Sequence, residues 1–309
     1  MKNYFSFNLT GKKYLPIWIL FLICFMVPYG VLIFSMKNIQ HGDSPSLIFF
    51  PLILLIIIVA FAFSFYTTKL TIENVFYKDQ PIVFSGTFGI FIGKVLLGLF
   101  LTIITLGIYM AWFLADLQKF FTNNSSFNQE NFEFKGKAGK LFVILLLTMF
   151  VPVIILTIIM SVFIVSNKDN APMFILISQM MMFIILIPYM YYVYKWIVNI
   201  RYKDYSITWH TEFWPSCGKI ALEILLSFIT LGIFFPLAML RLYTYFAPKT
   251  HAVSDENTLT FGYDIDPLND FLFIWGQILL TIITLSIYYP WAFCKTRSRI
   301  LSKTYLIQN

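Results

Sequence analysis

Long apolar runs separated by short polar stretches dominate this chain. Four of the runs are continuous enough to cross a hydrocarbon core of about 30 Å as helices. They are Tyr14–Met36, Ser46–Tyr66, Leu141–Ser166 and Met173–Trp196. The pattern therefore predicts four membrane-spanning helices.

Three more apolar segments are also long enough to span, and each has nearly the same phrase near its middle. The segments are Val95–Leu114, Ile220–Leu240 and Phe271–Phe293. The phrase reads TIITLGIY at 102–109, SFITLGIF at 227–234 and TIITLSIY at 281–288. An internal repeat in apolar sequence indicates that one membrane unit was copied, and we expect function where the copies meet.

The repeat extends beyond this phrase. An offset of 125 residues carries Gly93-Lys94 onto Gly218-Lys219 and Gly11 onto Gly136. The third phrase follows the second by only 54 residues, because 284 − 230 = 54, which leaves no room for another pair of long spans. We therefore expect one membrane domain, residues 1–309, with repeats at 1–125 and 126–250 and a truncated third copy at 251–309.

The three repeated segments have two interpretations. Seven plain spans would place the basic N-terminus and the basic C-terminus on opposite sides, against the positive-inside rule. If each segment enters and leaves on one side, the outward loops are Lys37–Pro45 and Asn167–Pro172, which hold only Lys37 and Lys168 of the 22 basic residues. Alternatively, the segments are unbroken helices whose Ser and Thr side chains bond back to their own backbone. The sequence leaves both interpretations open.

The polar stretches between the apolar segments alternate apolar and polar residues and are rich in aromatic and β-branched side chains, as in Asn131-Phe-Glu-Phe-Lys. This pattern predicts short strands. The expected fold class is therefore all-α: a polytopic helical membrane protein with tandem internal repeats and about seven hydrophobic segments. Three of these are re-entrant or broken in one interpretation, and short β-hairpins lie at the membrane face.

Composition supports the membrane class, since 59% of residues are hydrophobic, 12% are charged and the mean hydropathy is +0.78. No nucleophile and base pair, phosphate-binding glycine loop or metal-protease helix occurs, so we expect no enzyme, no catalytic residue and no cofactor. Cys24, Cys217 and Cys294 lie far apart in the sequence, so we expect neither disulfides nor a metal site. Basic residues are dispersed among loops, which argues against nucleic-acid binding.

One stretch follows a known pattern. Phe271-x-Phe273-Ile-Trp275 leads into LLTIITLSIYYPWA at 279–292, followed by KTRSR at 295–299. Through these residues the chain resembles the YjgN-like bacterial inner-membrane proteins, the domain of unknown function 898 family. Ser286 stands where glycine is usual, and Asp116 stands where a basic residue would be expected. The resemblance implies a multi-span bacterial plasma-membrane protein, its N-terminus cytoplasmic by the charge rule, with no established activity.

Ionisable groups inside apolar segments are the first functional candidates. Glu223 lies one helical turn after Lys219, and the repeat places Gly98 and Gln277 at equivalent positions. The three would form a polar constriction if the copies face one another; alternatively, Glu223 and Lys219 form a local pair. The candidate pathway or helix-break residues are Thr102, Thr105, Gly107, Ser227, Thr230, Gly232, Thr281, Thr284, Glu223 and Gln277.

Two charged clusters near the C-terminus complete the candidates. We expect the acidic cluster to be a solvated loop; its members are Asp255, Glu256, Asp264, Asp266 and Asp270. We expect the basic cluster to attract anionic lipid headgroups, at about 1 kcal/mol per charge near the surface. Its members are Lys295, Arg297, Arg299 and Lys303.

Two functional classes follow from these patterns. One is a small-solute or ion transporter or channel, with its path at the junction of the repeated segments. The other is a non-transporting membrane protein that organises lipids or partner proteins, because buried charge is scarce. The sequence favours the first slightly and indicates no particular solute, protein partner or oligomeric state.

Overall fold

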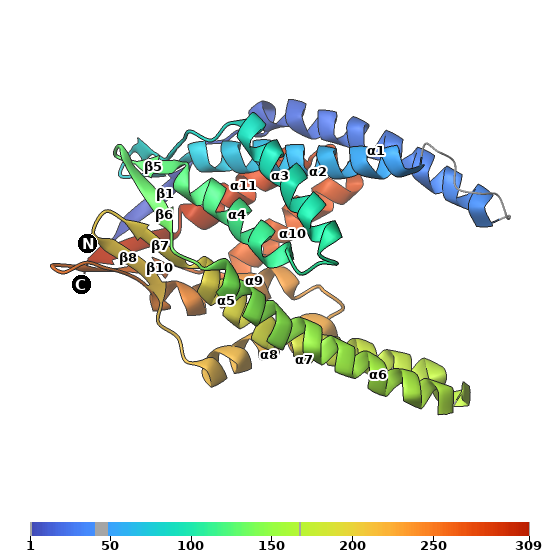
Figure 1. The fold of residues 1–309 in the computed structure, drawn as a ribbon. Helices are drawn as coiled ribbons and strands as arrows, with labels where there is room; N and C mark the ends of the chain where they lie inside the picture. Colours follow the sequence, from blue (N-terminus) through green and yellow to red (C-terminus); the bar gives the residue numbers. More distant parts are fainter. Residues whose placement is uncertain (1, 41–48, 167, 309) are drawn as a thin grey trace.

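The computed structural model describes residues 2–40, 49–166 and 168–308. Eleven strands in these residues form one antiparallel sheet, and the helices extend from it toward one side (Figure 1). The predicted all-α class is therefore wrong, because strands expected as separate hairpins are joined edge to edge. The elements, in chain order, are β1 (Asn3–Phe7), α1 (Gly11–Gln40), α2 (Phe49–Glu73), β2 (Val75–Tyr77), β3 (Gln80–Pro81), β4 (Val83–Phe84), α3 (Phe88–Ile104), α4 (Met110–Asn123), β5 (Ser125–Phe127), β6 (Glu130–Phe134), α5 (Ala138–Leu145), the π-helical η1 (Leu146–Phe150), α6 (Val151–Ser166), the 3-10 turn η2 (Lys168–Asn170), α7 (Ala171–Ile197), β7 (Asn199–Tyr202), β8 (Tyr205–Trp209), α8 (Phe213–Ile229), α9 (Phe235–Phe246), the 3-10 turn η3 (Ala247–Lys249), β9 (Thr250–Val253), β10 (Thr258–Tyr263), α10 (Pro267–Ile283), α11 (Tyr289–Leu301) and β11 (Thr304–Gln308).

The described chain consists of five modules, in each of which a strand leads into a pair of helices that returns to the sheet. At the base of each helix pair, the backbone N–H just after the first strand donates to a carbonyl at the start of the return strand, either the residue just before it or, for Asn199, its first residue, over 2.8–3.0 Å. The five donor and acceptor pairs are Asn8 with Asn74, Ser85 with Asn124, Lys135 with Asn199, His210 with Lys249, and Asp264 with Lys303. The chain thus repeats one structural module five times, a finer division than the three sequence repeats.

The sheet closes nearly into a barrel. Its order runs β3-β2-β1-β11-β10-β9-β8-β7-β6-β5-β4, so its two outermost strands, β3 and β4, are separated in the chain only by Ile82. Ile82 itself donates its N–H to the Val75 carbonyl over 3.0 Å. The rings of Tyr77 on β2 and Phe127 on β5 lie 5.9 Å apart across this seam. Closure leaves no long unpaired edge, which is how a sheet avoids pairing with other chains.

The helices form a ring above this sheet. Each helix packs against the next one in the chain, and α11 packs against α1. Five clusters of buried side chains hold the ring together, centred on residues such as Phe65, Tyr14, Leu141, Ile220 and Leu240. Both termini lie at the sheet, where Asn3 on β1 pairs with Leu306 on β11 (Figure 1).

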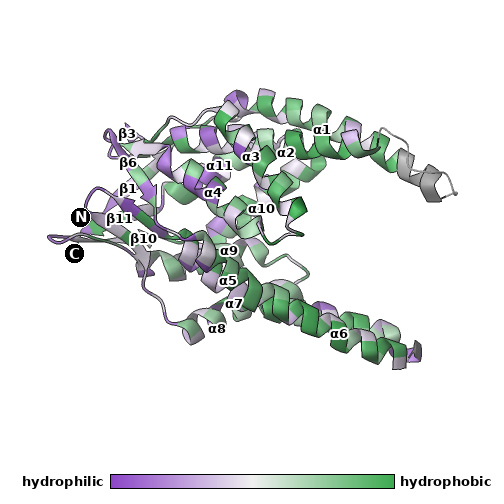
Figure 2. Ribbon diagram, viewed as in Figure 1, coloured by the Kyte–Doolittle hydropathy of each residue, from purple (hydrophilic) through white to green (hydrophobic). Residues whose placement is uncertain are grey.

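In the described chain, four helical stretches are long and apolar enough to cross a membrane: Gly11–Phe34, Phe49–Glu73, Ala138–Ser166 and Ala171–Ile197. They coincide with the four long spans predicted from sequence, although residues 46–48 of the second lie outside the described residues. Figure 2 shows apolar residues along the helices and polar residues gathered at the sheet. Of the about seven hydrophobic segments expected, four are single helices of spanning length, and the three repeated segments are not single helices.

Each repeated segment is a helix, a tight turn and a second helix. Thr105, Thr230 and Thr284 end the first helices, and the next helices begin five residues later. The residue after each of these threonines is a leucine with φ near +50°, at 106, 231 and 285. The following N–H then donates to a carbonyl five residues back, over 2.7–2.8 Å, which is the bond of a Schellman helix end. The unbroken-helix interpretation is therefore wrong.

The backbone conformation at the second residue of each turn explains why glycine occurs there in two of the three repeats. Gly107 and Gly232 have φ of +91° and +84°, a conformation that favours glycine because it has no Cβ. Ser286 holds φ of +70° at the equivalent position. The departure from the family pattern at Ser286 therefore leaves the turn intact but places a side chain in a strained conformation, at a cost of roughly 1 kcal/mol.

Candidate functional site

The central threonine of each repeated segment joins two helices. Thr105 Oγ1 donates to the Leu101 carbonyl over 2.7 Å and accepts the Tyr109 N–H over 2.9 Å. Thr230 and Thr284 make the same pair of bonds, at 2.7–3.0 Å. Each hydroxyl thus caps the end of one helix and the start of the next.

The hydroxyl one turn earlier bonds back to its own helix. Thr102, Ser227 and Thr281 donate to the carbonyls of the residues four positions before them, over 2.6–2.8 Å. All six predicted pathway hydroxyls therefore donate to backbone groups of their own hairpin. They stabilise the helix break, and their role as ligands along a path stays a prediction.

The three residues at the position of Glu223 do not form one constriction. A Cβ at Gly98 would overlap the ring of Phe113 on α4. Glu223 pairs with Arg241 on α9, and Gln277 accepts from the Tyr288 hydroxyl over 3.2 Å. Each therefore joins the two helices of its own hairpin.

Glu223 is the more deeply buried of the two polar members of this set, with 1% of its side chain exposed. Its Oε1 lies 2.6 Å from Lys219 Nζ and 3.1 Å from Arg241 Nε. The local pair with Lys219 expected from sequence is present, and Arg241 is a second partner that the sequence did not indicate. The position of the turn in the sequence could have indicated this partner. Glu223 and Arg241 lie nine residues on either side of Gly232, since 232 − 223 = 9 and 241 − 232 = 9.

Two adjoining cavities lie between α7, α8 and α9. The one nearer the hairpin turn has a volume of about 430 Å³, and the one nearer the sheet about 260 Å³. They share Met190, Met239 and Leu242, so they adjoin and together make up one apolar region. Glu223 contributes the only charged side chain among the described residues that line it. Ligand cavities of proteins fall in this size range and are mostly apolar with a few placed polar groups.

Gln277 lies beside a separate cavity of about 510 Å³ between α10 and α11. Tyr288, which donates to Gln277, accepts from Lys295 Nζ over 2.8 Å. Glu223 of the second hairpin and Gln277 of the third thus line different cavities.

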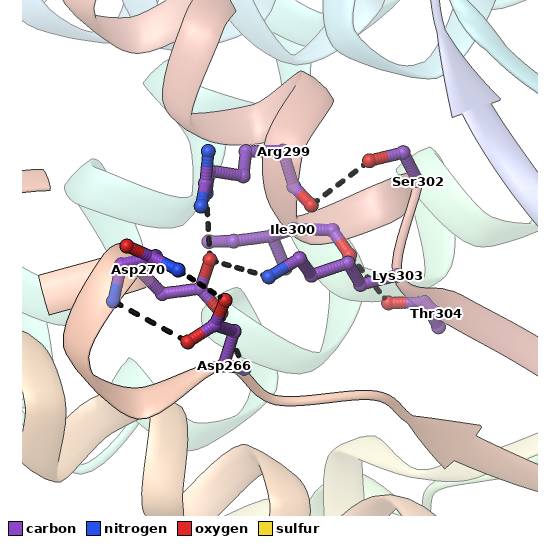
Figure 3. A network of polar contacts seen from close by, with 8 residues as sticks. Asp266, Asp270, Arg299, Ile300, Ser302, Lys303 and Thr304 are labelled. Carbon is purple, nitrogen blue, oxygen red and sulfur yellow. Dashed lines mark hydrogen bonds and ion pairs between the residues drawn. The ribbon is translucent and has the colours of Figure 1, made fainter. Parts of the chain in front are cut away.

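A second buried carboxylate, Asp270, lies at the start of α10 (Figure 3). Its Oδ1 accepts from Arg299 Nε and Lys303 Nζ, each over 2.6 Å, and its Oδ2 accepts the Asp266 N–H over 3.0 Å. Burial alone would raise the pKa of Asp270, but the bonds from Lys303 and Arg299 outweigh it and hold the pKa below its usual range.

This network corrects the interpretation of both charged clusters. Asp270 is 1% exposed, so it does not belong to a solvated loop, although Asp255 and Glu256 are exposed as expected. Asp264 accepts from Lys2 and from the Tyr4 hydroxyl at the sheet.

The basic cluster divides in the same way. Arg299 and Lys303 are engaged by Asp270, whereas Lys295 and Arg297 are exposed on α11. A lipid-headgroup role stays a prediction for all four and is better suited to Lys295 and Arg297.

Comparison with known proteins gives a family and no activity. No curated protein and no solved structure matches the chain. A family described as "Bacterial protein of unknown function (DUF898)" matches residues 2–262. The match ends within β10, before the hairpin of α10 and α11 that carries the clearest resemblance in the sequence. Because it covers most of the chain, the chain belongs to the DUF898 family of bacterial proteins of unknown function.

Proposed function

We propose that this protein is a multi-pass protein of the bacterial plasma membrane, with its sheet and both termini in the cytoplasm. The distribution of positive charge supports this orientation. Lys37 and Lys168 lie at the ends of the long helices that are far from the sheet. The other 20 of the 22 basic residues lie outside the two outward loops, Lys37–Pro45 and Asn167–Pro172. Residues 41–45 of the first outward loop, Lys37–Pro45, lie outside the described residues.

Single-cysteine labelling tests this orientation. In a background whose native cysteines are replaced by alanine, Ser6→Cys, Glu130→Cys and Ser302→Cys are expected to react with a membrane-impermeant maleimide only after the membrane is permeabilised. Asp169→Cys, at the far ends of α6 and α7, is expected to react in intact spheroplasts. Labelling of Ser302→Cys but not Ser6→Cys in intact spheroplasts would place the termini on opposite sides and contradict the proposal.

Within that membrane, we propose that the protein binds a lipid in the space between α7, α8 and α9. The apolar region made up of the two adjoining cavities carries this proposal. Its outer rim is formed by apolar side chains of the hairpin turn that are freely exposed, among them Leu231, which is 91% exposed. In a bilayer this rim meets acyl chains, so a lipid chain can enter the space without crossing a polar barrier.

The hydrogen bonds within the repeated segments make transport of an ion or solute through them the weaker candidate function. A path for an ion or polar solute needs free ligands to replace the hydration shell. Each hydroxyl of the repeated segments already donates its one hydrogen to a backbone carbonyl of its own hairpin, and Thr105, Thr230 and Thr284 also accept a backbone N–H, so no donor and fewer acceptor positions are left for a solute. This agrees better with a protein that organises lipid than with one that conducts solutes.

Filling the cavity tests the lipid proposal. Met239→Trp is expected to lower the amount of lipid that co-purifies with the protein several-fold, because Met239 lines both cavities and the larger indole occupies their space. The amount is measured by extraction and mass spectrometry after exhaustive washing in detergent. Leu225→Trp is the matched control, since Leu225 lies on α8, is 51% exposed and lines neither cavity. Equal lipid in the two variants would contradict the proposal.

A further inference from the structure

The charges beside the α7, α8 and α9 cavity are unbalanced. Glu223 is the one carboxylate of this group, and Lys219 and Arg241 are both directed at its Oε1. One negative charge thus faces two positive charges, which leaves an excess of one positive charge. Lys219 is 21% exposed and Arg241 is 37% exposed, and neither belongs to the lining of the two cavities, so each presents part of its side chain outside them, beside Glu223.

The second carboxylate oxygen is unused. Glu223 Oε2 is buried and has no hydrogen-bond partner among residues 2–40, 49–166 and 168–308. Leaving a buried acceptor unsatisfied costs about 1–3 kcal/mol, and buried polar groups in proteins normally have partners. The same residue lines the larger cavity, so this unsatisfied acceptor lies in the wall of that cavity.

The position of this group along the hairpin indicates how a lipid would lie. Glu223 and Arg241 are each nine residues from Gly232, or roughly 13 Å along the helix axis at 1.5 Å per residue. Between them and the turn, the cavity is lined by apolar side chains such as Phe228 and Phe235. A lipid with its chain toward the turn and its headgroup toward the sheet has the orientation of the leaflet on the sheet side.

We propose that this cavity selects a phospholipid that combines an anionic phosphodiester with a hydroxyl on its headgroup, as phosphatidylglycerol does. The phosphodiester pairs with Arg241 and Lys219, the headgroup hydroxyl donates to Glu223 Oε2, and an acyl chain fills the cavity toward the turn. Charge-assisted hydrogen bonds of this kind are among the stronger ones in proteins. The inference rests on the proposed lipid binding and adds the headgroup that is recognised.

The other hairpins supply an internal comparison. Repeat offsets of 125 and 54 residues place Gly98 and Gln277 at the position of Glu223, and Asp116 and Lys295 at that of Arg241. Neither of the other hairpins combines a carboxylate at the first position with a cation at the second. Lys94, which the offset of 125 residues places at the position of Lys219, therefore serves as a matched cation that lacks the carboxylate.

Native mass spectrometry of the purified full-length protein, titrated with lipids of identical acyl chains, tests the proposal. Phosphatidylglycerol has the phosphodiester and the hydroxyl, phosphatidylmethanol has the phosphodiester alone, and phosphatidylcholine has no net charge and no donor. We expect phosphatidylglycerol to bind about tenfold more tightly than phosphatidylmethanol, the effect of one charge-assisted hydrogen bond. Phosphatidylmethanol should in turn bind more tightly than phosphatidylcholine.

Variants assign the preference to this site. Glu223→Gln is expected to remove the discrimination between phosphatidylglycerol and phosphatidylmethanol, because an amide N–H replaces the free acceptor. Arg241→Gln is expected to reduce the preference of both anionic lipids over phosphatidylcholine. Lys94→Gln should leave both ratios unchanged, because its hairpin has Gly98 in place of the carboxylate.

The outcomes separate this inference from the proposed function. Equal binding of phosphatidylglycerol and phosphatidylmethanol to the unaltered protein would overturn the headgroup assignment while leaving lipid binding in place, and this comparison requires no variant to fold. Equally tight binding of phosphatidylethanolamine, whose ammonium is also a donor, would overturn the preference for an anionic lipid. Failure of every lipid to bind would overturn the proposed function itself.

Discussion

Replacement of Asp270 by asparagine is expected to lower the free energy of unfolding by about 3 kcal/mol, from the loss of a buried charge with two cationic partners. Asparagine keeps the shape of the side chain and removes its charge. Arg299 and Lys303 then point at a neutral group, each from 2.6 Å. Because these cations are 30% and 22% exposed, water relieves part of the penalty, which places the effect at the low end for broken buried pairs. Denaturant titration of the purified protein in detergent, followed by near-ultraviolet circular dichroism, measures the loss.

Asp255→Asn is the control for this substitution. It removes the same charge at an exposed position between β9 and β10, so its effect should lie within about 0.5 kcal/mol of zero. A double-mutant cycle of Asp270→Asn with Arg299→Gln should show clear coupling, because the two side chains are in contact. Equal effects of Asp270→Asn and Asp255→Asn would mean that the network in Figure 3 contributes nothing to stability.

The pH dependence of the Asp270 network has a defined sign. The pKa of this carboxyl is lower in the folded protein than its usual value of 3.8. A lowered folded pKa means that the unfolded chain binds the proton more readily. The stabilisation is therefore fully present above about pH 4 and is lost as the pH falls below that value and through the folded pKa. The Asp270→Asn variant should lack this part of the acid sensitivity.

The sequence predicted the parts of the fold that leave a local pattern. The four long spans are continuous apolar runs. A repeated phrase with glycine at 107 and 232 marked the segments in which the helices break, although it left an unbroken helix open. The charge count favoured both termini on one side, which agrees with the pairing of Asn3 with Leu306. The apolar runs and the repeated phrase are local signals, whereas the charge count uses the whole chain.

Closure of the sheet leaves no such signal. The pairing of β1 with β11 joins residues about 300 positions apart, and the seam at Ile82 depends on strands of only two residues. Alternation over two or three residues predicts a short hairpin equally well. The choice between separate hairpins and one closed sheet is made by tertiary pairing, which propensity does not describe.

The interpretation of the charged residues failed for a related reason. Asp270 was grouped with its neighbours in sequence, whereas its partners Arg299 and Lys303 follow it by 29 and 33 positions, because α10 and α11 form a hairpin. Once the turn at 284–288 is recognised, folding the chain back there brings these residues together. The same operation about Gly232 would have paired Glu223 with Arg241.

Gly98 is expected to be the least tolerant glycine of α3. Gly98→Val should lower the free energy of unfolding by about 3 kcal/mol, at the upper end of the usual cost of overpacking a core. A Cβ at this position would overlap the ring of Phe113, including the ring carbon nearest its backbone. Phe113 is 2% exposed within the core cluster of Phe65, Phe91 and Phe120, so its ring has no space into which to move. The same denaturant titration measures the effect.

Gly93→Val is the matched control, because it places the same side chain five residues earlier on the same helix. In the described structure no heavy atom lies within 4 Å of a Cβ built at Gly93, and this face of α3 is exposed. Its effect should therefore stay within about 0.5 kcal/mol of zero. Phe113→Leu should recover part of the stability lost in Gly98→Val, since a smaller side chain makes room for the new methyl groups. Equal losses at positions 93 and 98 would show that backbone conformation sets the cost, and would contradict close packing of α3 against α4 at this point.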